Sequence, residues 1–276
     1  MQIFVYVAAK DFSGEYRTRR RCRLAVWLCL LAVMVCGAPL HSQEQARPLS
    51  ANGTDPTEAR SRFDANIGRI DLLSAGYIFE ISAGGDLAFS RRGSVGVSAP
   101  LVYADFPSGT TTEIGDITFN ALASVIQKPQ ASTFRSLAIG ADFVLENGDV
   151  EAGTGFGQNI IAPYLAASFY PGEGFMLAPL IKDFISLEED ESGRSIHDLS
   201  LRLLTVFSFE SGFWLNLTPE LIVDLNGDQK NLYTLRATFG KMINKNVGFA
   251  GDVIYQIAGE KRYDYLARLN MRYLFQ

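Results

Sequence analysis

Cysteine is missing from most of the chain. Cys22, Cys29 and Cys36 all lie within the first 42 residues, so residues 43–276 contain no thiol. This excludes a disulfide framework and any thiolate metal site from that stretch. It also holds a single histidine, His197, which excludes a histidine-based zinc site. We therefore expect a chain without a metal or another cofactor.

Long apolar runs and excess positive charge are also missing after residue 42. A helix needs about 20 apolar residues to cross a bilayer, and no run there comes near this length. Six of the 25 basic and two of the 30 acidic residues precede residue 43, which leaves 19 basic and 28 acidic residues. A formal charge of −9 argues against nucleic acid as a partner. Any membrane span in this stretch would have to be a strand.

The first 42 residues have the pattern of an export signal. Five arginines between residues 17 and 23 precede an apolar run of twelve residues, Leu24–Val35. This run is too short for a spanning helix and has the length of a signal-peptide core. We predict a signal peptide with an N-terminal extension over 1–42, with cleavage after Gly37 or Ser42. A lipid-anchor cysteine at Cys36 fits less well, because Val35 stands where a small residue is expected.

Apolar and polar residues alternate with a period of two through most of the remaining chain. Residues 43–69 are polar and lack this period, which favours a flexible periplasmic leader. From residue 70 onward, segments of about ten alternating residues are separated by turn residues, as in outer-membrane barrels. The predicted strands are 70–81, 84–90, 94–105, 113–126, 134–145, 159–170, 175–186, 197–208, 213–224, 231–242, 247–257 and 263–275. We predict an all-β fold, a closed antiparallel transmembrane β-barrel over 70–276 with twelve strands, or ten as the alternative.

The alternation assigns the two faces of each strand. The apolar face should contact lipid, because the reverse would place Arg236 and Arg268 in hydrocarbon at about 2–4 kcal/mol each. The predicted lumen-lining charged residues are Glu80, Asp116, Asp142, Arg202, Glu220, Arg236, Asp252, Asp264, Arg268 and Arg272. Such charges can pair across the lumen and close it as a structural network, or flank a water-filled path and set its selectivity. A twelve-strand barrel lies between the filled eight-strand and the open sixteen-strand cases, so both readings stay open.

Prolines and aromatic residues add two local expectations. Pro100, Pro163, Pro179 and Pro219 fall inside predicted strands, and a closed barrel has no edge for a missing N–H donor, so we predict local bulges there. Aromatic residues gather at the predicted periplasmic strand ends, where they should form an interfacial girdle. These residues are Phe169, Tyr170, Phe175, Phe209, Phe213, Trp214, Tyr273 and Phe275.

Three stretches carry a family resemblance. They are Gly115-Asp116-Ile117, the run from Leu137 to Asp149 that ends Glu-Asn-Gly-Asp, and Ile161-Ala-Pro-Tyr-Leu165. Together they resemble the outer-membrane protein family labelled "meta-pathway of phenol degradation", with Glu146-Asn147 in place of its usual Pro-Thr-like pair. The resemblance runs over roughly residues 70 to 275. It implies a transporter barrel for small solutes, aromatic or hydrophobic ones among them.

These observations leave three functional hypotheses. The first is an outer-membrane channel for small solutes, with the lumen charges as a filter and loop 146–158 folded in as a constriction. The second is a non-transporting structural or surface-interaction barrel with a plugged lumen. The third is a lipid-acting membrane enzyme, which would need His197 and a serine such as Ser195 or Ser200, but no nucleophile-elbow motif is present. We expect no enzyme and no catalytic residue.

Location and partners follow from the first hypothesis. The chain should be exported by a cleaved N-terminal signal and should reside in the bacterial outer membrane. The expected partners are outer-membrane lipid and lipopolysaccharide, the barrel-assembly machinery and a small-molecule solute.

Overall fold

The structure is a computed structural model. It describes residues 52–72, 76–128, 132–190, 193, 195–227, 231–259 and 263–275, with the side chain of Asp264 outside this part. The predicted signal peptide lies outside the described residues. Within them, no helix is long and apolar enough to cross a membrane.

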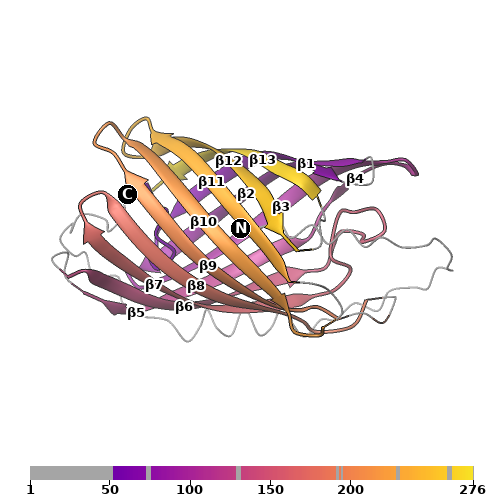
Figure 1. The fold of residues 1–276 in the computed structure, drawn as a ribbon, viewed down its shortest axis with the longest axis horizontal. Coiled ribbons are helices and arrows are strands. Elements are labelled where there is room, and N and C mark those ends of the chain that lie inside the picture. The colour runs from indigo at the N-terminus through magenta and orange to yellow at the C-terminus, as the bar shows by residue number, and fades with distance from the viewer. Residues whose placement is uncertain are drawn as a thin grey trace. The chain divides into compact units, whose positions relative to one another are not determined.

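The described chain folds into thirteen antiparallel strands. They are β1 (Arg62–Leu72), β2 (Tyr77–Ser90), β3 (Gly93–Phe106), β4 (Gly109–Ile114), β5 (Ile117–Gln127), β6 (Phe134–Leu145), β7 (Ile160–Gly172), β8 (Phe175–Ser186), β9 (His197–Ser208), β10 (Phe213–Asp224), β11 (Leu232–Met242), β12 (Val247–Ala258) and β13 (Tyr263–Leu274). Each strand except β4 pairs with two neighbours in the ring, and β1 pairs with β13, so the sheet closes on itself. The hairpin strand β4 pairs with the end of β3 and projects at one end of the barrel (Figure 1). The predicted closed twelve-strand barrel is confirmed.

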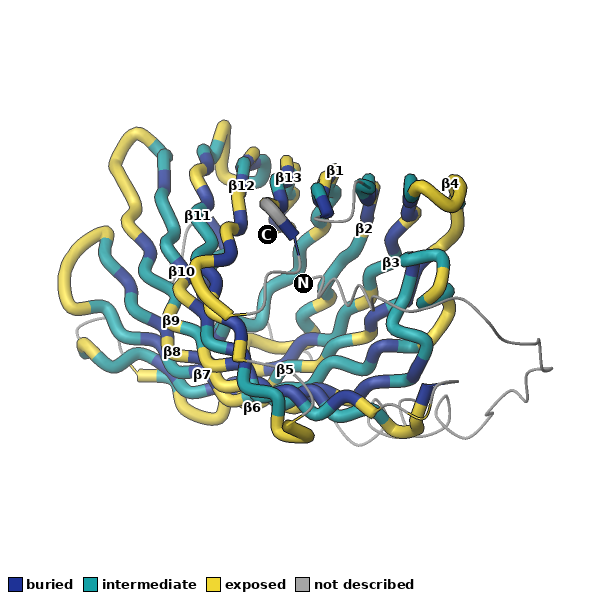
Figure 2. Tube along the Cα trace, turned by 45° about the vertical axis from the view of Figure 1, so that its right-hand side comes forward, coloured by how far each residue is buried: buried dark blue, intermediate teal, exposed yellow. Residues whose placement is uncertain are grey.

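Residue parity separates the inner and outer faces. Over most of the strands, odd-numbered apolar residues face outward, with Ile67 48% and Leu269 68% exposed, whereas even-numbered Glu80 and Arg268 are 4% and 7% exposed. Figure 2 shows buried and exposed residues alternating along the strands. The sequence forms strands because this period of two gives every segment one apolar face for lipid and one mixed face for the interior.

The two barrel ends differ in their connections. At the end that holds Leu274, the strands are joined by connections of two to six residues, and we call this the turn end. At the opposite end, the loop end, connections reach fourteen residues in 146–159. In bacterial outer-membrane barrels, short turns lie on the periplasmic side and longer loops outside.

The bounds of the first two predicted strands were wrong. Strand β1 begins at Arg62, inside the region predicted as a leader, and the predicted segment 70–81 spans the end of β1, a connection and the start of β2. Strand β1 was assigned to the leader because its sequence is polar. Its inward face carries Asp64, Asn66 and Gly68, and arginines lie near its two ends. The barrel boundary therefore lies eight residues earlier than predicted.

The bulges predicted at the prolines are absent at Pro219 and Pro163. No register shift occurs at Pro219, yet the β9–β10 pairing skips from Leu217 to Glu220 and then continues in the same register. The β7–β8 pairing likewise skips Pro163 without a shift. Each lipid-facing proline therefore removes a donor locally, and the strands stay aligned without the predicted bulge.

The predicted aromatic girdle is present in part. Outward-facing rings pair across strands at the turn end, with centroids 5.0 to 5.4 Å apart. These pairs are Phe134–Phe169, Phe175–Phe207 and Phe213–Phe239. Trp214 and Tyr170 were wrongly placed in the girdle, because both occupy even positions on the inward face.

Candidate functional site in the barrel lumen

The barrel encloses a polar cavity of about 360 Å³. Six of the predicted lumen residues line it: Asp142, Arg202, Arg236, Asp252, Arg268 and Arg272. Glu80 and Glu220 are buried at inward positions of β2 and β10 without lining this cavity. Asp116 lies just before β5 at the loop end, and the side chain of Asp264 lies outside the described part. The structure thus gathers most of the predicted charges around one space.

Ion pairs run along the wall of this cavity. Arg202 Nε on β9 lies 2.7 Å from Glu220 Oε1 on β10, and Arg236 Nη2 on β11 lies 3.0 Å from Asp252 Oδ1 on β12. Lys182 on β8 contacts Asp142 on β6 directly, across the intervening β7. These pairs link strands that are adjacent or one strand apart, so their charges are neutralised at the wall and do not bridge the lumen.

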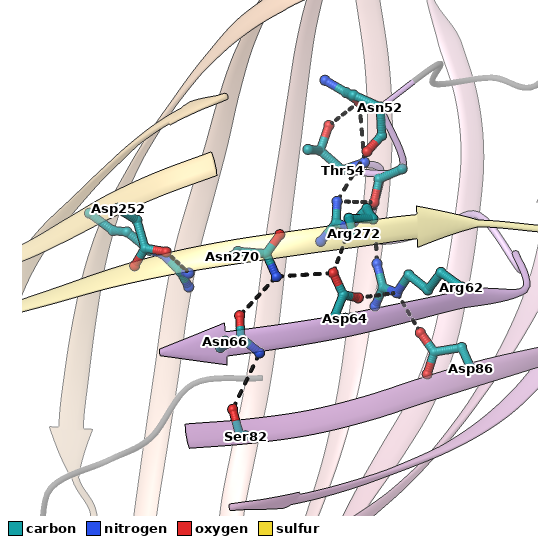
Figure 3. Close-up of polar contacts among 12 residues, drawn as sticks. Asn52, Thr54, Arg62, Asp64, Asn66, Ser82, Asp86, Asp252, Asn270 and Arg272 are labelled. Carbon is teal, nitrogen blue, oxygen red and sulfur yellow. Dashed lines mark hydrogen bonds and ion pairs between the residues drawn. The ribbon is translucent and has the colours of Figure 1, made fainter. Parts of the chain in front are cut away.

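A denser cluster lies at the turn end (Figure 3). Asp64 Oδ1 accepts from Arg272 Nε at 2.8 Å, and Asp64 Oδ2 lies 3.3 Å from Arg62 Nε. Arg62 Nε also donates to Asp86 Oδ2 at 2.6 Å. Asn270 donates to both Asp64 and Asn66. Two arginines and two carboxylates therefore form a chain across β13, β1 and β2 with no net charge.

Glycine is required in the middle of this polar wall. Gly96 on β3 pairs with Asp86 on one side and Asn120 on the other. Asn120 Nδ2 donates to Asp86 Oδ1 at 3.0 Å over it. A Cβ on Gly96 would lie 2.1 Å from that oxygen and 2.5 Å from that nitrogen. The hydrogen bond can form because the residue beneath it has no side chain.

The variant Gly96→Ala should therefore lose the Asp86–Asn120 hydrogen bond. We expect the free energy of unfolding to fall by about 0.5–1.5 kcal/mol, the typical net contribution of one hydrogen bond. Urea unfolding of the refolded barrel measures it. Gly251→Ala is the matched control, since a Cβ there meets its nearest atom at 3.6 Å. Equal stability of the two variants would contradict this account.

Several lumen residues were missed from sequence. Arg62 and Asp64 fell within the predicted leader, and Asp86 fell in a segment too short to assign with a face. Lys182 was not among the predicted lumen residues, although its even position places it inward and it is 8% exposed. Assigning every even-numbered strand residue to the inward face would have identified Lys182 and Asp86 as lumen residues.

The segment before β1 enters the lumen. Residues Gly53 to Pro56, with Glu58 and Arg60, line the cavity, and Thr57 is fully buried. This stretch was predicted to belong to a flexible leader. The prediction failed because Thr57 contacts Ser136 and Ser168, which are more than 75 residues away along the chain, and no local pattern shows such contacts.

The interior is apolar toward the loop end. One cluster of inward-facing residues comprises Ile70, Leu72, Ile78, Val102, Ala104, Ile254, Tyr263 and Leu266, with Phe106 packed against it. A second comprises Val144, Ile160, Ala162, Phe184 and Ile196, with Phe156 packed against it. The loop-end interior therefore holds two apolar clusters, whereas the arginine and aspartate cluster lies at the turn end, where a smaller apolar cluster of Met176, Ala178 and Val206 is also present.

Loop 146–159 is bound to Asp116. Its carboxylate accepts from the backbone N–H groups of Asn147 (2.9 Å), Gly148 (2.9 Å) and Phe156 (2.6 Å). Burial raises the pKa of Asp116 above its ordinary value, while these three donors act in the opposite direction. The Gly-Asp and Glu-Asn-Gly-Asp motifs singled out in the sequence thus meet at one anchor.

The same loop reaches toward the interior. A Cβ on Gly153 would lie 2.7 Å from Phe106 Cζ and 3.7 Å from the inward-facing Ile78, and Phe156 packs on the second apolar cluster. Gln158 is fully buried. Loop 146–159 therefore folds onto the apolar end of the lumen, in the manner expected of a constriction.

No metal site is present in the part of the chain that the structure describes, where no three histidine, cysteine or acidic side chains group together. His197 Nε2 lies 3.4 Å from Asp183 Oδ1, and the Ser195 hydroxyl accepts from Asn226 Nδ2 at 3.2 Å. The serine and histidine of the enzyme hypothesis are thus each held by a different residue.

Comparison with known proteins identifies the fold. No family model matches the chain, and no curated protein matches it either. The COG4313 outer membrane channel from Pseudomonas putida F1 is similar in structure, with a TM-score of 0.62, 11% identity and coverage of 84% of this chain and 100% of that chain. The NanC porin matches with a TM-score of 0.55, 11% identity and coverage of 78% and 99%. At these identities the likeness shows the fold, which this chain shares with outer-membrane channels and porins.

Proposed function

We propose that this protein is an outer-membrane channel for small solutes, exported by its N-terminal signal. The observation that carries the proposal is the polar cavity inside a closed barrel whose ion pairs lie along the wall. Charges paired at the wall leave room for water and a solute, and their exposed atoms can select among ions. The fold shared with outer-membrane channels supports this reading.

The solute class follows from the two halves of the lumen. A molecule entering at the loop end meets the apolar clusters around Ile78 and Phe184, and then reaches the arginine- and aspartate-lined cavity. Small amphiphilic compounds, such as an aromatic ring that bears a hydroxyl or carboxylate, suit this order of surfaces. The resemblance to the phenol-degradation family implies small aromatic or hydrophobic solutes, which stays a prediction.

A second function has one specific observation in its favour. Residues 52–57 hydrogen-bond to wall residues on both sides of the turn end, as a permanent plug would. A non-transporting structural barrel would keep this arrangement at all times. Conductance of the folded protein distinguishes the two functions.

Single-channel recording in planar bilayers tests the channel. We expect conductance steps, and we expect Arg236→Ala to shift the reversal potential in a salt gradient toward cation selectivity, because it removes a lumen cation and leaves Asp252. Arg69→Ala is the control: it deletes the same charge from an outward-facing position on β1. No conductance from folded protein, or equal shifts in both variants, would count against a selective lumen.

A further inference from the structure

The segment 52–60, which we call the N-terminal segment, is held first at β13 and β1. Arg272 Nη1 donates to the carbonyl oxygens of Asn52 (3.0 Å) and Gly53 (3.1 Å), and Arg62 Nη1 donates to that of Gly53 (3.2 Å). Gly53 has a φ of +66°, and a Cβ there would lie 3.0 Å from Leu274. The close approach to the wall therefore needs glycine at this position.

The same segment is held again at β6 and β7. The Thr57 hydroxyl contacts that of Ser136 directly and lies 3.2 Å from that of Ser168, and all three side chains are fully buried. Tyr170 donates its phenol proton to Asp55 Oδ2 at 2.8 Å. Three hydroxyls and one carboxylate thus fix this part of the segment.

The two attachment points lie on opposite walls. In the ring of twelve strands, six steps separate β13 from β7 in either direction. A stretch bound to Arg272 on β13 and to Ser168 on β7 must therefore cross the lumen at the turn end. Gly53 to Pro56 form one boundary of the polar cavity in doing so.

The attachment differs from that of the barrel strands. Residues 52–60 belong to no strand, and their described links to the wall are hydrogen bonds made by arginine, hydroxyl and carboxylate groups. These bonds involve no strand pairing, so they can break while every strand of the ring keeps its neighbours. Release of the segment therefore requires far fewer bonds to break than opening of the sheet does.

We propose that the N-terminal segment is a built-in gate that closes the turn end of the channel and leaves it when the channel opens. This inference rests on the proposed channel function. In the closed state the segment blocks the lumen between β13 and β7. Its release exposes Arg62 and Arg272 to the passing solute and leaves the twelve-strand ring unchanged.

Conductance of the mature protein in planar bilayers tests the gate. Thr57→Lys places a long cation in a fully buried site and should force the segment off Ser136 and Ser168, so we expect time-averaged conductance to rise at least tenfold. Thr110→Lys, the same substitution at an exposed position of β4, should leave conductance unchanged. Unchanged conductance of Thr57→Lys, in protein whose electrophoretic mobility still shifts on heating like a folded barrel, overturns the gate.

A disulfide supplies a second test, which replaces two of the buried hydroxyls with thiols of similar size and places no charge there. Residues 43–276 contain no cysteine, so Thr57→Cys with Ser136→Cys introduces the sole thiol pair into the mature chain, at two positions whose hydroxyls are in contact. Oxidation should lower conductance at least tenfold and reduction should restore it, while Thr57→Cys alone responds to neither. Equal conductance of the oxidised and reduced double variant overturns the gate. The channel function itself fails only if neither the unsubstituted protein nor any variant conducts.

Discussion

Replacing Glu220 with alanine should lower the free energy of unfolding of the barrel by about 3–5 kcal/mol, the usual cost of leaving a buried charge without its partner. Glu220 is 6% exposed on the inward face of β10. Its Oε1 accepts from Arg202 Nε at 2.7 Å and from the Ser200 hydroxyl at 2.6 Å. Its Oε2 accepts from Thr234 at 3.4 Å. One carboxylate therefore joins β9, β10 and β11.

The chain supplies its own probe for this measurement. Trp214 is the sole tryptophan in residues 43–276, and it is buried on the inward face of β10, the strand that carries Glu220. Urea unfolding of the refolded barrel can therefore be followed by tryptophan fluorescence. Glu173→Ala, in an exposed two-residue turn, is the control and should stay within about 0.5 kcal/mol of the parent.

Replacing both Arg202 and Glu220 separates the contribution of the ion pair to stability from that of side-chain packing. In Arg202→Met/Glu220→Met both charges are gone and similar volumes remain, so we expect most of the lost stability to return, as for other buried ion pairs replaced by apolar residues. A loss below about 1 kcal/mol in Glu220→Ala would show that water solvates Arg202 once its partner is removed. Failure of the double variant to recover stability would show that Ser200 and Thr234, and not Arg202, depend on the carboxylate.

The fold could be predicted because its cause is local. A period of two is visible in any ten residues, and an apolar face in every segment, together with the predicted export signal, favours a membrane barrel. The same parity placed Arg202, Arg236, Asp252, Arg268 and Arg272 inward, where the structure has them. Which of these charges pair could not be predicted, since that depends on strand register and stagger.

The start of the barrel and its N-terminal segment could not be predicted for the opposite reason. Strand β1 carries polar residues on its inward face, so its apolar signal reduces to Phe63, Ala65 and Ile67. The preceding segment is ordered by Ser136, Ser168 and Arg272, which come from strands far along the chain. No window of sequence contains both partners, and polarity alone favoured disorder.

Removal of the Asp116 carboxylate should have a large effect that is confined to loop 146–159. Asp116→Ala removes the acceptor for three backbone N–H groups in loop 146–159, and hydrogen bonds to a charged group contribute about 1.5–3 kcal/mol each. The loop is also tightly folded: a Cβ on Gly148 would lie 2.3 Å from the carbonyl oxygen of Thr154, and one on Gly155 would lie 2.6 Å from Asp116 Oδ1. We expect the amides of 146–158 to exchange with deuterium at least 100-fold faster, which mass spectrometry of this peptide measures.

The variant Asp116→Asn tests which of the three hydrogen bonds depends on which carboxylate oxygen. An amide oxygen can still accept from Asn147 and Gly148, which both use Oδ1, but its nitrogen cannot accept from Phe156, which uses Oδ2. Exchange should therefore accelerate around Phe156 and remain slow at 147–148. Stability of the twelve-strand ring should change little, because the loop lies outside the strands. Equal exchange rates in the parent and Asp116→Ala would mean that the apolar contact of Phe156 with the second cluster, and not the carboxylate, holds the loop over the lumen.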